Sequence, residues 1–525
     1  MSWRRWLYLL HRWFGVGMCL LFAMWFFSGV VMMYVGFPRL GVDERLAALP
    51  ALQAQSLRFG PQALLAQLDD TARIDGLRLS SVTGRPAYLL QTAERVTFGL
   101  FADTGERFAA FGEADALRAA AVYADTLGLA GEGGPDYRDR IDVDQWSVSS
   151  ELHRHRPLHR VALHDAAGTE LYVSSRTGEV VRDTSASERA WNWLGANLHW
   201  LYPLQLRRHG SLWYWLVVVV SLAGLVSIIT GAVVGVMRLR LRKRYRGRDV
   251  TPYRGALKLH HLMGLCFLLP LTTFLFSGLM SMGPWGIFDD DLPYGEQRAL
   301  YRQVPPPATA LDGSTDVAAL RRVIAARPDS REVVWHWLAG QPHLYTVSGD
   351  VHRAAVTAPA DWAGPALAQI QQAMAGHAVS AIDTLARYDS YYYAHHDDWR
   401  PLPVLRARFD DPAQSWFHID LATGELLNRL TATGRLERWI YNGLHSLDFQ
   451  FLINRRPLWD VVVITLSIAG LVLSLTSVII AWRRLKPKPK RRNPRRAGGS
   501  ARLPANSTRA THPTLTVRQE KPSWQ

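Results

Sequence analysis

"LHRWFG" at residues 10–15 and "LHHLMG" at residues 259–264 both place a histidine at the start of a long apolar run. An offset of 249 residues superimposes the two runs without a gap. It aligns His11 with His260, Gly15 with Gly264, Ser28-Gly29 with Ser277-Gly278, and Met33 with Met282. The two runs are therefore copies of one pattern, and such a repeat is recognised before any site is interpreted.

A second offset, of 246 residues, aligns the later part of each half. It superimposes Thr177-Gly178-Glu179 on Thr423-Gly424-Glu425, Trp193 on Trp439, Leu198-His199 on Leu444-His445, and Ala223-Gly224-Leu225 on Ala469-Gly470-Leu471. Each half then consists of an apolar span, a mixed region, a short amphipathic segment and a second span, in the same direction. Two parallel copies in a membrane imply a pseudo-twofold axis along the membrane normal.

Four stretches have the apolar character of membrane spans, for which about 20 residues are needed. They cover approximately residues 13–36, 212–236, 261–282 and 459–482. A chain of 525 residues is also long enough for several folding units. The sequence therefore predicts an integral membrane α-helical bundle of four transmembrane helices, carrying two α+β domains and an internal parallel duplication.

The distribution of basic residues predicts the orientation. The formal net charge is +15, but residues 238–258 and 483–496 alone contribute +8 and +9. Basic residues that directly follow spans mark the cytoplasmic side of a membrane. We therefore expect both termini in the cytoplasm, the large domains in the periplasm of a bacterial inner membrane, and membrane lipid rather than nucleic acid beside the basic segments.

The predicted organisation follows from the spans and the repeat. It comprises 1–36 (N-terminal cytoplasmic end and first span), 37–185 (first α+β domain), 186–237 (amphipathic segment and second span), 238–258 (basic loop), 259–283 (third span), 284–432 (second α+β domain), 433–482 (amphipathic segment and fourth span) and 483–525 (disordered basic tail). Alternating residues around glycine turns predict hairpins at 85–108, 171–181 and 416–427, with "QPHLYTV" (341–347) as the counterpart of "RPAYLL" (85–90). Residues 60–69 and 363–375 are expected to form covering helices.

Four histidines form two symmetric pairs, one at each membrane face. His11 and His260 lie at the cytoplasmic ends of corresponding spans, and His199 and His445 lie 14 residues before the tryptophans that open the second and fourth spans. Two facing imidazoles in a helix bundle can supply both axial ligands of a haem iron. Because the sequence has no CxxCH motif, we expect two non-covalent haems of the b type.

Glycines support this interpretation. Gly15 and Gly264 each lie one helical turn after a histidine of the inner pair and would leave room for a flat macrocycle. They could instead permit close helix packing, which is the preferred explanation for the Ser-Gly pairs.

Other residues remain possible partners of the haem groups. A single histidine at a membrane edge is more often interfacial. His261 is the alternative to His260, and His153 and His396 are the alternatives for the outer site; they belong to the clusters "ELHRHRPLHRVALHD" (151–165) and "YYYAHHDDWRPLP" (391–403), whose spacing fits no closed metal motif. Arg12, Arg207, Arg208 and Arg455 could pair with haem propionates, although residues beside spans more often meet lipid phosphates.

Several of these motifs together resemble the PepSY-associated transmembrane family, which includes bacterial inner-membrane ferric-siderophore reductases. The resemblance rests on "LHRWFG", "LHHLMG", the "TGE" hairpins, "YYYAHHDDWRPLPVLRARFDDP" (391–412) and "RWIYNGLHSLDFQFLINRRPLWD" (438–460), and it extends from His11 to Trp482. It implies two periplasmic PepSY-like domains and two b-type haems held by His11, His199, His260 and His445. One departure is "LHWLYPL" in the first half where the second has "LHSLDFQF", so the two outer sites are not expected to be equivalent.

The implied activity is electron transfer to a periplasmic ferric siderophore, with release of Fe(II). The sequence has no GxGxxG motif, so we expect the electron donor to be a separate cytoplasmic reductase or a membrane quinol. The rivals are a haem-free scaffold or accessory protein of a siderophore or iron transporter, and a permease. A permease would favour broken helices and polar groups at mid-membrane, for which Pro270, Thr272 and Thr273 are the only indications.

Overall fold

The computed structural model describes residues 2–129, 133–245, 248–289, 294–311, 315–356, 361–394 and 399–486. The chain divides into one compact unit, Met1–Ala481, and a second unit, Trp482–Gln525. The first unit contains every described helix and strand apart from the last residues of α16 (Leu458–Leu485).

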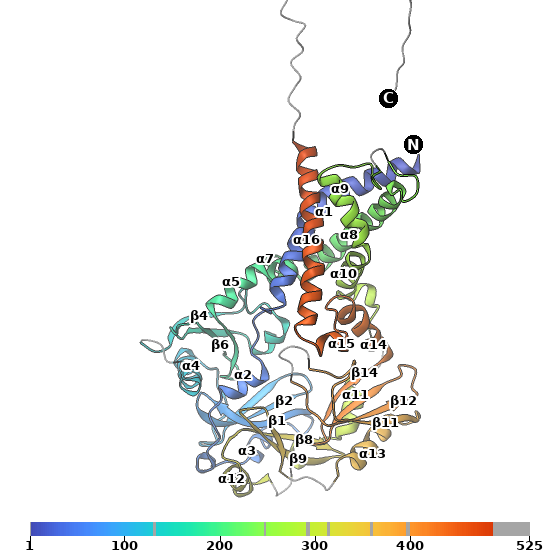
Figure 1. Cartoon of the computed structure of the whole chain (residues 1–525). Helices are drawn as coiled ribbons and strands as arrows, with labels where there is room; N and C mark the ends of the chain where they lie inside the picture. Colours follow the sequence, from blue (N-terminus) through green and yellow to red (C-terminus); the bar gives the residue numbers. More distant parts are fainter. Residues whose placement is uncertain are drawn as a thin grey trace, which may run out of the picture. The chain divides into compact units, whose positions relative to one another are not determined.

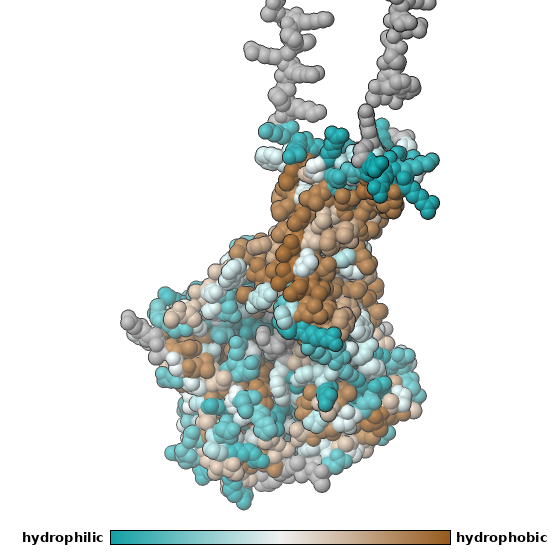
Figure 2. Space-filling view, in the orientation of Figure 1, coloured by the Kyte–Doolittle hydropathy of each residue, from teal (hydrophilic) through white to brown (hydrophobic). Residues whose placement is uncertain are grey.

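Long apolar helices form one region of the first unit (Figure 1). Among the described residues, α1 (Trp3–Met32), α8 (Gly210–Arg238) and α16 are long and apolar enough to cross a membrane. α9 (Ala256–Cys266) and α10 (Leu268–Met280) meet this criterion only as a pair, which is bent by 70°. The described part of the chain thus has three such helices, or four if the bent pair is one span. Figure 2 shows an apolar surface over these helices, as a bilayer requires.

The third predicted span is therefore not one straight helix. Pro270 is the third residue of α10 and has no N–H to donate to the carbonyl of Cys266, which its ring would also crowd. The helix ends at Cys266 and begins again at Leu268. The corresponding residue in the first half is Leu21, and α1 continues through it without a break.

Small residues let these helices approach one another. A Cβ atom on Gly224 of α8 would lie 2.7 Å from Leu275 of α10, and one on Gly470 of α16 would lie 2.4 Å from the ring of Phe26 of α1. Glycine is common where membrane helices pack closely. The two contacts join positions that correspond under the two sequence offsets, so each half packs its second helix against the first helix of the other half.

The two predicted α+β domains share one sheet. Its six strands follow the order β10 (Arg353–Ala355), β9 (Gln341–Ser348), β8 (Ser330–Leu338), β1 (Ile74–Val82), β2 (Arg85–Thr92) and β3 (Thr97–Phe101). The central pair, β1 and β8, is antiparallel, with Arg78 opposite Val334. The fully buried side chains of Leu79, Tyr88 and Trp337 belong to the core of this sheet.

Buried ion pairs hold the central strands together. Arg78 of β1 contacts Glu332 of β8 at 2.7 Å and Glu179 at 2.5 Å, while Arg45 contacts Glu332 at 2.7 Å. Burial alone would raise the pKa of Glu332, but the two guanidinium groups outweigh it and hold that pKa well below its ordinary value. This cluster links the first half of the chain to the second.

Each half also has a four-stranded antiparallel sheet of its own. One comprises β4 (Asp136–Ile141), β5 (Leu158–Ala162), β6 (Glu170–Ser174) and β7 (Val180–Thr184); the other comprises β11 (Val379–Leu385), β12 (Val404–Phe409), β13 (Trp416–Asp420) and β14 (Leu426–Leu430). α4 (Glu113–Leu127) packs on the first sheet, and α13 (Ala363–Ala373) covers the second. The strands β5, β6 and β7 begin 246 residues before β12, β13 and β14.

The predicted hairpin strands and the helix near residues 363–375 are confirmed, whereas the helix predicted at 60–69 is reduced to α3 (Gln62–Leu65). The remaining elements are short and connect the sheets to the long helices. They are α2 (Val42–Ala47), η1 (Ala54–Ser56), η2 (Ser150–His155), α5 (Ala186–Leu194), α6 (Ala196–His199), α7 (Leu204–Arg207), η3 (Pro284–Gly286), α11 (Tyr294–Arg302), η4 (Pro307–Thr309), α12 (Val317–Ala326), α14 (Ala432–Arg438), the π-helix η6 (Trp439–Gly443) and α15 (Gln450–Ile453).

Candidate functional site

The inner histidine pair joins the two halves of the chain. His11 on α1 and His260 on α9 have ring centroids 6.1 Å apart, with planes inclined by 40°. The Nδ1 of His11 lies 3.0 Å from the carbonyl oxygen of Ser227 on α8. The Nδ1 of His260 lies 3.3 Å from Thr476 Oγ1 and 3.2 Å from Ser477 Oγ on α16. Each ring is thus oriented by the second long helix of its own half.

The outer pair has the same arrangement. His199 ends α6, His445 follows η6, and their ring centroids are 6.0 Å apart with planes inclined by 70°. The Nδ1 of His199 lies 3.1 Å from Ser28 Oγ, and the Nδ1 of His445 lies 3.1 Å from Ser277 Oγ. Each outer ring is thus oriented by the first long helix of its own half.

Glycines next to these serines make room for the outer rings. A Cβ atom on Gly29 would lie 3.3 Å from Cε1 of His199, and one on Gly278 would lie 3.3 Å from Cε1 of His445. These distances are tight, so any side chain at either glycine would press on the imidazole. The Ser-Gly pairs were expected to serve helix packing, and the structure instead places them against the histidines.

The environment of the outer rings keeps them neutral. Burial, with a further contribution from the nearby His445, lowers the pKa of His199 to about 3, and burial also lowers the pKa of His445. The Nε1–H of Trp25 donates to the carbonyl oxygen of His199 at 2.9 Å, and the ring of Tyr441 stacks on His445 at 5.5 Å. Neutral imidazole is the form that binds a metal.

The hydroxyl groups that contact these rings donate their own hydrogens to other acceptors. They donate to backbone carbonyls about one turn earlier in their own helices: Ser28 to Met24, Ser277 to Phe274, and Thr476 and Ser477 to Leu473. Each hydroxyl oxygen can therefore only accept from the imidazole, so Nδ1 carries the ring hydrogen. The same holds for His11, because its Nδ1 contacts a carbonyl oxygen.

All four rings then present Nε2 with a free lone pair. None of these Nε2 atoms has a hydrogen-bond partner within the described part of the chain. Two imidazoles that share one metal through Nε2 have ring centres roughly 6 Å apart, since each metal–nitrogen bond is about 2.0 Å long. Both observed pairs match that spacing. The residues present fit a metal held axially by two histidines, as in a b-type haem.

The two pairs lie near opposite ends of α1. His11 precedes Ser28, the contact of His199, by 17 residues. A helix rises 1.5 Å per residue, so the two sites are separated by about 25 Å along α1. That separation is close to the roughly 30 Å hydrocarbon core of a bilayer. A metal group at each site would therefore lie near each membrane surface.

The two inner glycines and Arg12 are less close to the rings. A Cβ atom on Gly15 would lie 3.8 Å from Ser227 Oγ, and one on Gly264 would lie 3.7 Å from Leu473, which are ordinary contacts. Gly231 of α8 is the glycine that meets the inner pair, because a Cβ atom there would lie 2.6 Å from Cε1 of His11. Arg12 is partly exposed beside His11, with no hydrogen bond to any other residue that the structure describes.

The alternative histidines lie elsewhere. His261 has both nitrogens occupied, since Nδ1 is 2.8 Å from Thr251 Oγ1 and Nε2 is 2.8 Å from the carbonyl oxygen of Gly235. His153 is exposed on η2, and His396 lies outside the described residues. Over the described ranges, no three His, Cys, Asp or Glu side chains come close enough to hold a metal ion.

The residues that orient the rings were not predicted from the sequence. Ser28, Ser277, Gly29 and Gly278 contact the outer pair, and Ser227, Gly231, Thr476 and Ser477 contact the inner pair. A signal for the outer set was present, because Ser-Gly occurs at the same position in both halves. The signal for the inner set is weaker, because Thr476 corresponds to Thr230 but Gly231 corresponds to Ser477.

The family model of the PepSY-associated TM region matches residues 9–352, which is more than half of the chain. The chain belongs to this family. The match covers His11, His199 and His260 and ends before His445. Together with the long apolar helices, membership in the PepSY-associated TM family shows a membrane protein with β-rich domains. No curated protein matches the sequence.

Proposed function

We propose that this protein is a di-haem b oxidoreductase of the bacterial inner membrane that passes electrons to periplasmic ferric-siderophore iron and releases Fe(II). The observation that carries the proposal is the meeting of His11 with His260 and of His199 with His445, each at about 6 Å with Nε2 free. Haem, when bound, supplies a one-electron carrier at each site.

The residues of this chain have three tasks in such a protein. The four histidines would hold the two irons, with His11 and His260 at the inner site and His199 and His445 at the outer site. The Ser28 and Ser277 hydroxyls hold the outer rings in the tautomer that leaves Nε2 free, as outer-shell partners of metal-binding histidines do. The apolar helices keep water away from both sites.

Arg438 is suited to bind a carboxylate of the outer group. Its side chain is buried, and its Nε and Nη1 have no hydrogen-bond partner among the described residues. Its Nη2 donates to the carbonyl oxygen of Asp448, and its Nη1 lies 3.6 Å from the position of a Cβ atom on Gly443. Arg438 thus contacts both ends of the loop that carries His445. A buried guanidinium with free donors is stabilised by a bidentate carboxylate, such as a haem propionate.

The orientation and origin of the protein belong to the same proposal. The basic segments 238–258 and 483–496 would lie in the cytoplasm with both termini, and the β-rich domains would lie in the periplasm. We propose that the two halves arose by duplication and that the bent pair α9–α10 is the third of four spans. The electron donor would be a membrane quinol or a cytoplasmic reductase.

Reduction releases the metal because hard oxygen ligands hold Fe(III) more firmly than Fe(II). Each Fe(III) gains one electron, and the donor loses one electron for each iron that is reduced. The siderophore keeps its ligand groups, so no covalent bond within the siderophore has to break.

Absorption spectroscopy of the purified protein tests this proposal. We expect a Soret band that sharpens and shifts on reduction, about two haems per chain, and oxidation of the reduced protein by ferric citrate. A preparation that stays colourless when expressed with sufficient haem would favour the haem-free scaffold or accessory protein of a transporter.

The permease is a second candidate because one observation favours it. The break between α9 and α10 falls near the middle of this pair of helices, where a permease would need one, and Thr272 and Thr273 follow it. Their hydroxyls, however, donate to the carbonyls of Leu268 and Pro270 within α10 rather than facing a path. Uptake of labelled ferric chelate into vesicles without reduction of its iron would support the permease.

A further inference from the structure

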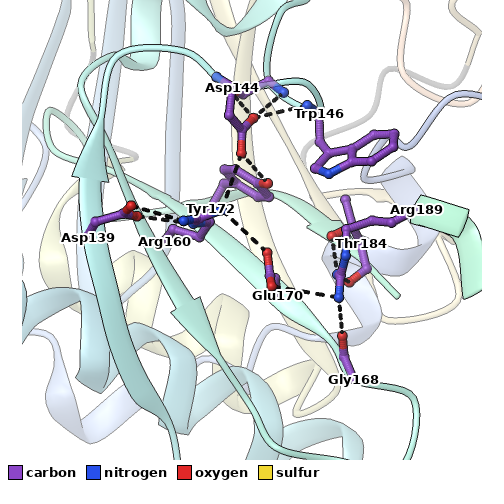
Figure 3. A network of polar contacts seen from close by, with 10 residues as sticks. Asp139, Asp144, Trp146, Arg160, Gly168, Glu170, Tyr172, Thr184 and Arg189 are labelled. Carbon is purple, nitrogen blue, oxygen red and sulfur yellow. Dashed lines mark hydrogen bonds and ion pairs between the residues drawn. The ribbon is translucent and has the colours of Figure 1, made fainter. Parts of the chain in front are cut away.

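A charged network in the first half has a counterpart of opposite charge in the second. Figure 3 shows the first-half network on β5, β6 and α5. Arg160 forms a bidentate pair with Asp139 at 2.9 and 3.0 Å and lies 3.8 Å from Asp144. Glu170 lies between two guanidinium groups, 3.9 Å from Arg160 and 3.7 Å from Arg189. Two arginines there meet three carboxylates.

The offset of 246 residues identifies the corresponding positions in the second half. Arg160 and Arg189 correspond to Arg406 and Arg435, so both guanidinium groups are retained. Glu170 is replaced by Trp416, and Ala162 is replaced by Arg408. The strand pairing agrees, since Ala162 lies opposite Glu170 and Arg408 lies opposite Trp416. The carboxylate between the arginines has therefore become an indole ring, and one arginine has been added.

Three guanidinium groups surround that ring. Their Cζ atoms lie 4.9 Å (Arg406), 4.7 Å (Arg408) and 4.1 Å (Arg435) from the ring centroid of Trp416. Carboxylates pair with two of them, Asp389 with Arg406 and Asp383 with Arg408. We call Trp416, Arg406, Arg408 and Arg435 the Trp416 cluster.

Arg435 has no carboxylate partner among the described residues. It donates to the carbonyl oxygens of Gln414 at 2.9 Å and Leu430 at 3.0 Å. Burial, together with the charges of Arg408 and Arg406, outweighs the opposing contributions of Tyr391 and Asp411 and lowers the pKa of Arg435, in line with its lack of a carboxylate partner. Asp411 is the nearby acid, and its counterpart Asp165 occupies the same position in the first half, so it does not alter the comparison.

The cluster can be reached from solvent. The side chain of Arg408 is 34% exposed, and Trp416 and Arg435 are partly exposed. The buried Nε of Arg408 has no hydrogen-bond partner in the described part of the chain. Glu437, an exposed acid of the same helix, is two residues from Arg435 and so lies on another face of α14.

Aromatic contacts connect the cluster to the outer histidine pair. The ring of Tyr391 lies 5.1 Å from Trp416 and 6.0 Å from Trp439, whose Nε1–H donates to the Tyr391 hydroxyl at 3.0 Å. Trp439 belongs to η6, as does Tyr441, which stacks on His445. The first half has Gly195 in place of Tyr441. The second half alone thus combines uncompensated positive charge with ring contacts toward the outer pair.

We propose that the Trp416 cluster binds an anionic ferric chelate with carboxylate or catecholate donors, and that the substrate therefore docks on the second half of the protein. This rests on the proposed function. Guanidinium groups recognise such oxygens through paired hydrogen bonds, and cation–π contacts with the indole hold three of them together where the first half has a carboxylate. The first half cannot offer this site, because Glu170 would repel the same anion.

Binding of gallium(III) citrate, a redox-inert anionic chelate, tests the proposal with the full chain in neutral detergent. Trp416→Glu restores the first-half residue, and we expect its Kd to rise about tenfold or more, because the new carboxylate would pair with the guanidinium groups and repel the anion. Arg408→Ala should act in the same direction. Turnover of ferric citrate should show a raised KM with nearly unchanged kcat, and haem content should not change.

Glu170→Gln is the matched control, because it changes charge in the corresponding first-half network. We expect its Kd to equal that of the wild type. Equal effects of Glu170→Gln and Trp416→Glu would overturn the proposal, since the charge would then act at long range. The proposal would also be overturned if Trp416→Glu weakened the interaction with phosphatidylglycerol, measured separately in nanodiscs, and left chelate binding unchanged. The cluster would then be a lipid site.

The outcomes separate this proposal from the function it rests on. A protein that holds two haems and reduces ferric citrate, yet is unaffected by Trp416→Glu and Arg408→Ala, overturns only the docking site. A haem-free protein that still binds gallium(III) citrate through the cluster overturns the reductase and keeps the anion site.

Discussion

The outer and inner histidine pairs are built from the same four long helices but differ in symmetry. At the outer pair, both rings contact a serine oxygen at 3.1 Å, and a Cβ atom on the neighbouring glycine would lie 3.3 Å from the ring; His445 Nδ1 also lies 3.1 Å from the carbonyl oxygen of Phe274. At the inner pair, Gly231 lies beside His11, whereas the corresponding Ser477 contacts His260 through its hydroxyl, as does Thr476. The outer site is therefore closer to twofold symmetry than the inner site.

The bend between α9 and α10 lies between the two sites and is a second difference between the halves. His260 is on α9, before the bend, whereas Ser277 is on α10, after it. In the first half, His11 and Ser28 lie on the continuous helix α1. We therefore expect Pro270, which lies at the bend, to matter for the position of His260 more than for the outer contacts.

The largest effect is expected from removing an outer ligand. His199→Ala and His445→Ala should each lower the haem content from about two to about one per chain, because each removes one of the two axial ligands of the outer haem. Pyridine haemochrome absorbance against protein concentration measures this. His261→Ala is the matched control, since both nitrogens of His261 serve hydrogen bonds, and it should retain both haems. Unchanged haem in both outer variants would place the ligands elsewhere.

Pro270→Leu should affect the inner site alone. Leucine is the residue at the corresponding position of α1, and it would allow α9 and α10 to join. In a His445→Ala background, which leaves only the inner haem, we expect lower haem content or a shifted Soret band. In a His11→Ala background, which leaves only the outer haem, the same substitution should have no effect. A change confined to the outer haem would contradict the role of the bend.

The sequence predicted the pairing because pairing needs only the repeat register. One offset places His11 on His260, another places His199 on His445, and any parallel arrangement of two copies brings these positions toward one axis. The hairpins were predictable for a similar reason, because alternation and glycine turns are local signals.

The sequence contained only a weak signal for the bend and none for the shared sheet. Pro270 was an indication of a broken helix, but it falls in an apolar run, and a proline can also stand in the first turn of an intact helix. The pairing of β1 with β8 joins strands far apart in the chain, so no local pattern specifies it. The role of Ser28 also depends on tertiary structure, because a serine in a span usually bonds only to its own helix.

Glu332→Gln should lower the free energy of unfolding of the β-rich domains by a few kcal/mol. The substitution leaves Arg45 without its charged partner and Arg78 with Glu179 alone, and breaking a buried ion pair costs about 3–5 kcal/mol. Because the pKa of Glu332 is held below its unfolded value, its contribution is present above the unfolded pKa of about 4.3 and is lost as the pH falls toward the folded value. Thermal unfolding at pH 7 and about pH 3 measures both effects.

The wild type should therefore lose stability between these pH values more steeply than Glu332→Gln. Arg73–Glu94, an exposed pair at 3.2 Å, offers the control Glu94→Gln, which should change stability by less than about 1 kcal/mol. Equal pH slopes for the wild type and Glu332→Gln would show that the buried carboxylate does not govern the acid sensitivity.

The smallest effect, and the finest test of the symmetry, comes from Ser28→Ala and Ser277→Ala. Each removes the oxygen that accepts from Nδ1 of an outer histidine, and loss of such a partner typically lowers metal affinity about 10–100-fold. The two effects should differ in size, because His445 Nδ1 keeps the carbonyl oxygen of Phe274 at 3.1 Å, whereas His199 Nδ1 has no second acceptor among the described residues. Haem dissociation to apomyoglobin should accordingly be faster in Ser28→Ala than in Ser277→Ala. The opposite order would mean that the serine, rather than the carbonyl, fixes the tautomer of His445.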